Sequence, residues 1–139
     1  MKSLLVEDFM TRRPITFSVD MTIAEAVEKI LAVNQSGGPV LGDDGKLVGF
    51  LSEQDCMTQM IESTYYREQV ARVGDIMSRD VLTVKPHTSV LEVAQQMALK
   101  RPRIYPVISD EGLLVGTIHR HQILKAIDTH LNQEYNLAV

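Results

Sequence analysis

This sequence offers almost nothing for cross-linking the chain. Cys56 is the only cysteine, which excludes an internal disulfide and a cluster of thiolate metal ligands. The Cys56 thiol could serve as a nucleophile only beside an activating base, and a buried structural cysteine is the simpler interpretation. The four histidines lack a zinc-ligand spacing with supporting cysteines, so we expect no metal site and no cofactor.

Long apolar runs and a strong excess of one charge are also missing. No uninterrupted apolar segment approaches the roughly 20 residues that cross a bilayer. Glu7 and Asp8 come too early in the chain for the apolar core of a signal peptide. The net charge of −4 at pH 7 gives no chain-wide attraction to nucleic acid or anionic lipid. We therefore expect a cytoplasmic protein that binds neither nucleic acid nor membrane and meets any anionic ligand through a local cationic cluster.

What the sequence does contain is an internal repeat. Residues 6–57 align with residues 73–124 at a constant offset of 67 (77 − 10) without a gap, and 13 of the 52 paired positions are identical. A chain of 139 residues with 45% hydrophobic residues is long enough to bury one core. Two copies of one structural unit are therefore predicted. Two motifs recur at the offset: Asp8–Arg12 as Asp75–Arg79, and Gly45–Gly49 as Gly112–Gly116.

Each copy has the pattern of strand, helix, strand, strand, helix. Thr22 with Glu25, and Ser89 with Glu92, have the spacing of capping boxes, in which a hydroxyl and a carboxylate satisfy free N–H groups at a helix start. Apolar residues at helical spacing follow both boxes. Two short apolar strands joined by an Asp-containing turn come next, and a second helix closes each copy. The expected strands are 39–41, 47–51, 106–108 and 114–118.

The two copies need each other, because one copy has too small a sheet to bury both of its helices. The predicted fold class is α+β, with two βαββα repeats packed sheet to sheet and related by pseudo-two-fold symmetry. The first repeat is placed at residues 1–63, a linker at 64–72, the second repeat at 73–131 and a C-terminal tail at 132–139. Tyr65 and Tyr66 in the linker stay undecided between packing and ligand contact.

Several motifs in this order resemble tandem CBS (cystathionine-β-synthase) domains, a pair often called a Bateman module. The similarity rests on the Asp-x-Met-Thr start at Asp8, the Pro39-Val40 strand, the Asp-Gly turn and the segment Gly49–Asp55, and it spans about residues 6–127. It implies the CBS-type fold and an adenosyl ligand such as AMP, ADP, ATP or S-adenosylmethionine, bound in clefts between the copies. It also implies regulation, and because the chain ends soon after the second copy, we expect the regulated protein to be a separate polypeptide.

The segment from Gly49 to Asp55 carries the chemistry of the expected site. Ser52 ends a strand and begins a helix, where free N–H groups and the helix dipole favour a phosphate. Asp55, one turn later, only accepts hydrogen bonds and suits the two ribose hydroxyls. Alternatively, Ser52 and Asp55 simply cap the helix. The resemblance favours ligand binding and includes Gln54 in the site.

In this family, the cleft that uses the Asp of one copy is completed by the opening strand of the other copy. Here that strand offers Val81, Leu82 and Thr83, whose apolar groups could hold a purine, and Phe50 could cover it. The alternative is that these are ordinary core residues.

A cationic stretch, Lys100–Arg103, is the local cluster that an anionic ligand would need. The resemblance assigns phosphate binding to Arg103, and a guanidinium can hold phosphate through two hydrogen bonds. The competing explanation is a solvated helix C-terminus that attracts cations.

The second copy departs from the family pattern. His119 and Gln122 stand at the positions of Ser52 and Asp55, so the carboxylate is lost. We therefore predict one competent site and one degenerate cleft that is empty, weak or altered in its ligand. The degenerate cleft is assigned Ile15, Thr16, His119 and Gln122.

The function predicted from these observations is that of an adenine-nucleotide sensor that forms a homodimer through helices exposing Met60 and Ile127. The alternative is a protein-interaction module with vestigial clefts. An enzyme would need a base or nucleophile among Asp55, His119 and Cys56, and none of them has a visible activating partner. We therefore expect no enzymatic activity.

Overall fold

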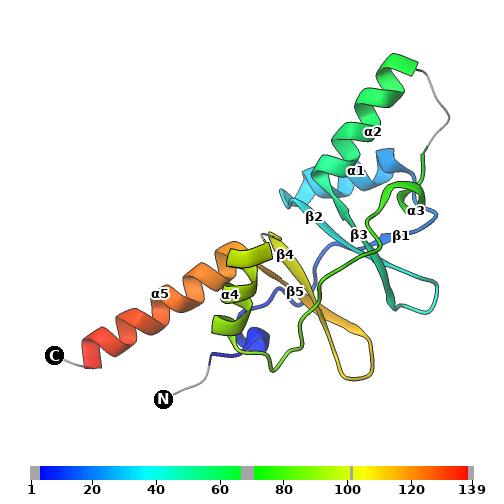
Figure 1. Ribbon diagram of the computed structural model, residues 1–139. Helices are drawn as coiled ribbons and strands as arrows, with labels where there is room; N and C mark the ends of the chain where they lie inside the picture. Colours follow the sequence, from blue (N-terminus) through cyan, green and yellow to red (C-terminus); the bar gives the residue numbers. More distant parts are fainter. Residues whose placement is uncertain (1–3, 67–70, 101, 138–139) are drawn as a thin grey trace. The chain divides into compact units, whose positions relative to one another are not determined.

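The computed structural model describes residues 4–66, 71–100 and 102–137, and it confirms the α+β class (Figure 1). The four predicted strands are present and run one or two residues further than expected at one end. The elements are η1 (Val6–Asp8, a 3₁₀ turn), β1 (Phe17–Ser18), α1 (Ile23–Val33), β2 (Gly37–Leu41), β3 (Leu47–Ser52), α2 (Glu53–Tyr66), α3 (Val73–Ile76), α4 (Val90–Lys100), β4 (Ile104–Ile108), β5 (Leu114–His119) and α5 (Arg120–Leu137).

The helix starts expected from the capping residues are confirmed. At the start of α1, the Glu25 N–H donates to Thr22 Oγ1 at 3.2 Å. At the start of α4, the Leu91 N–H donates to Ser89 Oγ at 3.2 Å. The last helix of each repeat continues past the predicted end of that repeat. Helix α2 ends at Tyr66 rather than at residue 63, and α5 ends at Leu137 rather than at residue 131.

The described residues form two compact units that do not coincide with the two sequence repeats. One, called the Ser52 unit here, consists of residues 14–81 and 112–114. The other, called the His119 unit, contains residues 4–13, 82–111 and 115–137. Each repeat begins with an opening segment, residues 6–13 in the first repeat and 73–81 in the second. The opening segment of the first repeat packs in the His119 unit, and that of the second repeat packs in the Ser52 unit.

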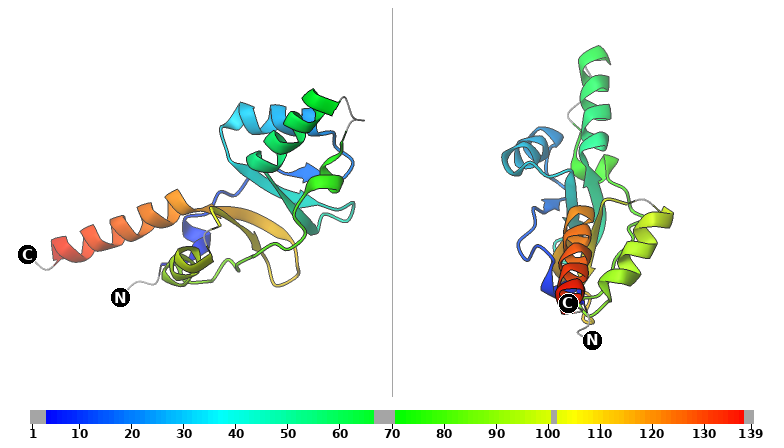
Figure 2. Two further views of the ribbon diagram at one scale, coloured as in Figure 1. Left: turned by 45° about the horizontal axis from the view of Figure 1, so that its top comes forward. Right: turned by 90° about the vertical axis from the view of Figure 1, so that its left-hand side faces the viewer.

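The Ser52 unit has a three-stranded sheet in the order β1-β2-β3, with β1 parallel and β3 antiparallel to β2. Helices α1 and α2 cover one face of this sheet (Figures 1 and 2). Part of α2 projects past the sheet edge in both figures. The buried core consists of Phe17, Ile23, Ala26, Ile30, Val40, Leu51, Cys56, Val73 and Met77.

The His119 unit repeats this plan with a shorter sheet. Strands β4 and β5 pair, and the counterpart of β1 is reduced to one parallel bridge between Val84 and Val107. Helices α4 and α5 pack on this sheet, and α5 projects beyond it as α2 does in its own unit (Figure 2). The buried core consists of Val6, Val84, Val90, Val93, Met97, Tyr105, Val107, Ile118, Ile123 and Ala126.

In the Ser52 unit, the opening segment of the second repeat packs against Gly49 of β3. The Phe50 N–H donates to the Ser78 carbonyl at 2.8 Å, and the Ser78 N–H donates to the Phe50 carbonyl at 2.9 Å. A Cβ on Gly49 would lie 2.5 Å from Met77 Sδ and 2.8 Å from the Ser78 oxygen. Only glycine therefore lets this segment lie flat against β3.

The His119 unit uses the equivalent residues in the same way. Thr11 and Thr117 exchange two backbone hydrogen bonds of 2.8 and 2.9 Å. A Cβ on Gly116 would lie 2.5 Å from the Thr11 oxygen and 2.9 Å from Met10 Sδ. The repeated motifs Asp-x-Met and Gly-x-x are thus structural partners: the methionine of one repeat packs on the glycine of the other.

Candidate functional site

Ser52 and Asp55 lie where β3 passes into α2, and they bond to each other reciprocally. The Ser52 N–H donates to Asp55 Oδ2 at 3.1 Å, and the Asp55 N–H donates to Ser52 Oγ at 3.0 Å. Both residues are half-buried. This is the helix cap that the sequence offered as the alternative to ligand binding. Any ligand that Asp55 holds would therefore meet a carboxylate that is already oriented by the start of α2.

A buried glycine, Gly37, packs directly against the backbone at Ser52. Gly37 has a φ of 149°, a value that side-chain-bearing residues rarely adopt. A Cβ at this position would collide with the backbone of Leu51 and Ser52. The first N–H of α2, on Glu53, donates to the Ser36 carbonyl at 2.8 Å. The loop before β2 therefore lies directly against the start of α2.

Ile15 and Thr16 belong to the same unit as Ser52. A Cβ on Gly38 would lie 2.6 Å from the Ile15 oxygen, so the two backbones touch. Lys29 Nζ donates to the Thr16 carbonyl at 2.6 Å and fixes this strand from α1. The sequence analysis assigned Ile15 and Thr16 to the cleft of His119. It could not show that the chain leaves the His119 unit after Arg13 and enters the Ser52 unit at Pro14.

The start of α5 is closed by a chain of hydrogen bonds. The His119 N–H donates to Gln122 Oε1 at 2.9 Å, as Ser52 does to Asp55. The amide of Gln122 also donates to Thr11 Oγ1 at 2.8 Å, which a carboxylate cannot do. Burial lowers the pKa of His119, whose Nε2 lies 3.3 Å from the Thr117 hydroxyl. Gln122 thus keeps the helix cap and ties it to the opening segment.

The two units also differ at the strand before the helix. At the offset of 67, Gly37 and Gly38 correspond to Ile104 and Tyr105. Tyr105 is completely buried, and Ile104 is 8% exposed. The His119 unit thus has bulky side chains at two positions where the Ser52 unit has buried glycines packed against neighbouring backbone. The repeat alignment contained this signal, but the sequence reasoning missed it.

The other expected ligand contacts divide between the units. Phe50, Gln54 and Val81 lie in the Ser52 unit, whereas Leu82, Thr83 and Arg103 lie in the His119 unit, where all three are exposed. The carbonyl of Arg103 accepts the Arg120 N–H at 2.9 Å. Arg101 and the side chains of Lys100, Tyr65 and Tyr66 fall outside the described residues.

Cys56 is not activated for catalysis. It is 2% exposed, and burial together with the Asp55 carboxylate raises the pKa of its thiol to about 11. The described residues contain no group of three or more His, Cys, Asp and Glu side chains that could hold a metal ion. Within the same residues, no helix combines the length and the apolar character needed to span a membrane.

A comparison with protein families assigns one domain type to both repeats. The model of the CBS domain matches residues 6–62 and 73–129, which is most of the chain. The chain belongs to the CBS-domain family. The recognition made from the sequence motifs is therefore confirmed, and so are the two CBS repeats of the predicted fold.

Some of the solved structures similar to this CBS pair hold adenosyl compounds. The CBS domain pair of protein MJ0100, in complex with 5′-methylthioadenosine and S-adenosyl-L-methionine, is 25% identical with a TM-score of 0.81, and the match covers 93% of this chain and 99% of that one. CBSX2 in complex with AMP is 27% identical with a TM-score of 0.78, over 91% and 97% of the two chains. CBSX2 is a CBS-pair protein from Arabidopsis thaliana.

Two curated relatives are much longer than this CBS pair. The uncharacterized protein MJ1225 of Methanocaldococcus jannaschii is 30% identical over 88% of this chain but only 42% of its own length. Inosine-5′-monophosphate dehydrogenase of the same organism is 30% identical over 86% of this chain and 23% of its own length. The chain thus spans less than half of the length of either protein.

Proposed function

We propose that this chain is a cytoplasmic regulatory CBS pair that binds an adenosyl ligand at the Ser52 unit and acts on a separate partner protein rather than catalysing a reaction. The observation that carries the proposal is the half-buried Ser52–Asp55 pair at the start of α2. The pair offers a fixed carboxylate for the two ribose hydroxyls. Ligand-bound relatives among the solved structures support an adenosyl compound.

The proposed site uses the residues that the Ser52 unit brings together. Asp55 accepts the ribose hydroxyls. The N–H groups of Ser52, Glu53 and Asp55 are already bonded within the protein, so the dipole of α2 is what favours a phosphate or its substitute beside Ser52. The backbone of Ile15 and Thr16, held by Gly38 and Lys29, supplies the edge that reads the base.

We further propose one ligand per chain. In the His119 unit, the side-chain amide of Gln122 donates a hydrogen bond to Thr11. Ile104 and Tyr105 stand there at the positions of Gly37 and Gly38. These changes remove the carboxylate that the proposal needs and alter the packing of the strand before the helix.

Calorimetric titration with AMP and with S-adenosylmethionine tests this function. Asp55→Asn keeps an oxygen that can accept the Ser52 N–H, so the helix cap survives while the ribose loses its carboxylate. We expect this variant to bind about 10- to 100-fold more weakly than the parent, which corresponds to about 1.4–2.7 kcal/mol.

Asp44→Asn is the matched control for this titration. Asp44 lies in the same unit and also accepts a backbone N–H, that of Lys46 at 3.1 Å, but it is exposed in a turn. Its affinity for the ligand should equal that of the parent. Equal binding by Asp55→Asn and Asp44→Asn would remove Asp55 from the site. If millimolar AMP and S-adenosylmethionine both failed to bind the parent, the alternative of an interaction module with vestigial clefts would be favoured.

A further inference from the structure

The two units carry different net charges. Residues 14–81, which form most of the Ser52 unit, contain 11 acidic and 5 basic residues, a net charge of −6 (5 − 11). Residues 4–13, 82–111 and 115–137 of the His119 unit contain 7 acidic and 8 basic residues, a net charge of +1 (8 − 7). The unit that offers a carboxylate to the ribose is therefore the unit that repels anions.

The charge difference is sharpest where the last helix of each repeat begins. At the start of α2, the Glu53 N–H donates to the Ser36 carbonyl at 2.8 Å, and at the start of α5, the Arg120 N–H donates to the Arg103 carbonyl at 2.9 Å. These two bonds join residues that correspond at the offset of 67. The same backbone contact thus carries one acidic side chain in the Ser52 unit and two basic side chains in the His119 unit.

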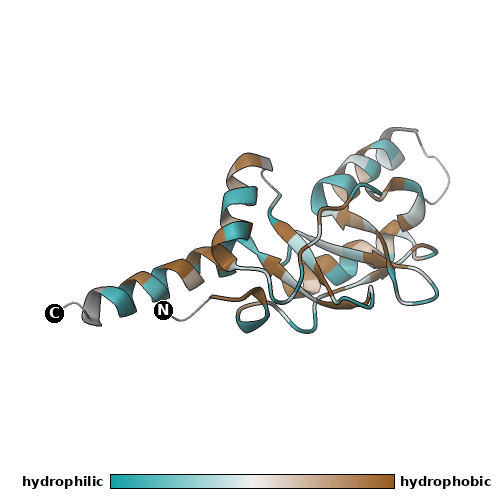
Figure 3. Ribbon diagram, turned by 60° about the horizontal axis from the view of Figure 1, so that its bottom comes forward, coloured by the Kyte–Doolittle hydropathy of each residue, from teal (hydrophilic) through white to brown (hydrophobic). Residues whose placement is uncertain are grey.

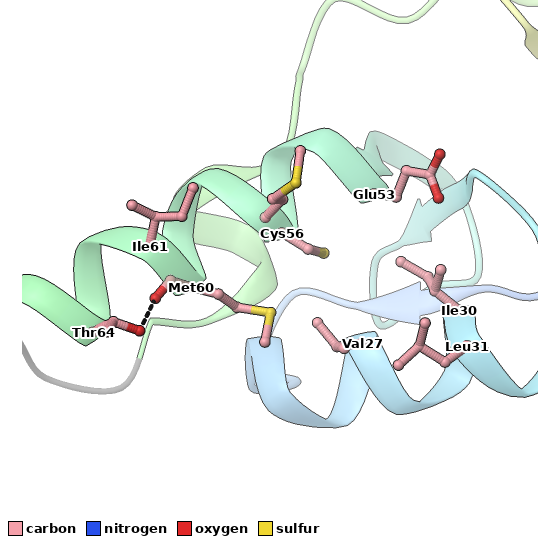
Figure 4. A pocket seen from close by; sticks show the side chains of 9 residues that line it. Val27, Ile30, Leu31, Glu53, Cys56, Met60, Ile61 and Thr64 are labelled. Atoms are coloured by element: carbon pink, nitrogen blue, oxygen red, sulfur yellow. Dashed lines mark hydrogen bonds between the residues drawn. The ribbon is translucent and has the colours of Figure 1, made fainter.

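Two carboxylates oppose the dipole of α2, the feature of the Ser52 unit that favours a phosphate. Glu53 and Asp55 both lie in the first turn of α2. Figure 4 shows Glu53 at this end of the helix, with its carboxylate pointing away from the apolar side chains further along α2. Within the described part of the chain, neither carboxylate forms an ion pair. The dipole is equivalent to about half a positive charge, so two full negative charges outweigh it.

Two basic residues of the Ser52 unit lie far from Ser52. Lys46 precedes β3 and Ser52 ends it, so the two residues stand about 20 Å apart along the strand. The hydrophilic turn that contains Lys46 lies at the end of the hairpin opposite α2 (Figures 1 and 3). Arg72 donates to the Asp20 carbonyl before the start of α1, whereas Ser36 follows the end of this helix, about 16 Å away.

The other basic residues are held elsewhere or face the base. Arg79 donates to a carbonyl of α3 at 3.4 Å. Lys29 Nζ donates to the Thr16 carbonyl at 2.6 Å and lies 5.7 Å from the centre of the Phe17 ring, on the strand that the proposed function assigns to the base. Arg67 lies outside the described residues. The described cations of this unit therefore leave the 5′ side of a bound ribose to the two carboxylates.

We propose that the Ser52 unit selects adenosyl ligands whose 5′ group is uncharged or cationic and discriminates against a 5′-phosphate, with Glu53 as a specificity-determining residue. This inference rests on the proposed function, because it takes Ser52 and Asp55 as the ribose site. A 5′-thioether adds no charge, and a 5′-sulfonium is attracted by Glu53. A 5′-phosphate carries a charge of about −1.5 to −2 at pH 7 and is repelled.

Calorimetric titration with adenosine, AMP and 5′-methylthioadenosine tests this selection, because the three compounds share the base and the ribose. We expect AMP to bind about tenfold more weakly than the other two in about 50 mM salt, and the difference to fall below about threefold in about 0.5 M salt, which screens the charges. AMP that bound as tightly as adenosine would overturn the inference and leave the proposed function standing. Failure of all three to bind at millimolar concentration would overturn both.

Charge reversal tests the role of Glu53. Glu53→Arg gives the start of α2 the charge that α5 has at Arg120, and its backbone bond to Ser36 does not depend on the side chain. We expect this variant to bind AMP about tenfold more tightly than the parent and adenosine within about twofold of it. Glu62→Arg is the matched control, because it makes the same reversal about 14 Å further along α2, and it should bind AMP within about twofold of the parent. An equal AMP affinity of the two variants would overturn the assignment of Glu53.

Arg103→Gln tests the other source of positive charge, because the sequence analysis assigned phosphate binding to Arg103. Its bond to Arg120 uses the backbone carbonyl and survives the substitution. We expect the variant to bind AMP within about twofold of the parent. A loss of about tenfold that spared adenosine would show that Arg103 holds a phosphate, and it would overturn the inference.

Discussion

The contact between Gly49 and the opening segment of the second repeat predicts a large effect from one added methyl group. In Gly49→Ala, the new Cβ would lie 2.5 Å from Met77 Sδ and 2.8 Å from the Ser78 carbonyl oxygen. The flexible Met77 side chain can move aside, but the Ser78 carbonyl is held by its bond to the Phe50 N–H at 2.8 Å. Overpacking costs about 1–3 kcal/mol, and each weakened hydrogen bond adds about 0.5–1.5 kcal/mol. We therefore expect a loss of about 2–4 kcal/mol in the free energy of unfolding.

Urea unfolding followed by circular dichroism measures this loss. Gly42→Ala is the matched control, because its Cβ would meet the Asp44 and Val48 side chains at 3.2 and 3.3 Å and the Lys46 carbonyl oxygen at an ordinary contact distance of 3.9 Å. The control should change the free energy of unfolding by less than about 1 kcal/mol. If Gly49→Ala stayed within about 0.5 kcal/mol of the parent, the segment around Met77 could not lie against β3 as described.

Three further predictions concern buried groups. No described residue bonds to the Tyr105 hydroxyl, which is completely buried, so Tyr105→Phe should raise the free energy of unfolding by about 1 kcal/mol in urea; a loss would show that the hydroxyl has a partner. Burial lowers the pKa of His119 from 6.5, so the unfolded chain takes up the proton first as the pH falls. The urea midpoint should therefore drop more steeply below pH 6.5 in the parent than in His119→Gln, and parallel curves would contradict this. Burial and the Asp55 carboxylate hold the pKa of Cys56 near 11, so iodoacetamide at about pH 8 should modify it about 100-fold more slowly in the native chain than in urea; equal rates would mean that the thiol is accessible and ionised.

Local patterns predicted the helices and strands well. The capping residues Thr22 and Ser89 act within one turn of the helix they start, so their effect can be read from neighbouring residues. The same is true of the change from β3 to α2 at Ser52, where both capping bonds lie within four residues. The start of α2 was therefore predicted together with the alternative role of Ser52 and Asp55 as its cap.

The partners of each segment could not be predicted in the same way. An alignment of repeats shows that Met10 and Met77 are equivalent, but not which glycine each one packs against. That choice depends on tertiary packing, because each of the two equivalent glycines lies against a methionine from an equivalent segment. The placement of Ile15 with Ser52 was missed for this reason, since it follows from where the chain passes between the units.

The hydrogen bond between Gln122 and Thr11 could not be predicted from the sequence either. The loss of the carboxylate at Gln122 was evident, and it led to the expectation of a degenerate cleft. That the amide would instead reach a residue 111 positions away depends on the same exchange of opening segments.

The exchange of opening segments sets an order for folding during synthesis. Apart from the turn at 112–114, the Ser52 unit is one continuous stretch, residues 14–81, and it can assemble as soon as that stretch has left the ribosome. Met10 instead waits for Gly116, which is added 106 residues later (116 − 10), or about 5–20 s at the usual rate of translation. Throughout that interval Val6 and Met10 have no completed core to enter, so their apolar side chains stay exposed on the nascent chain.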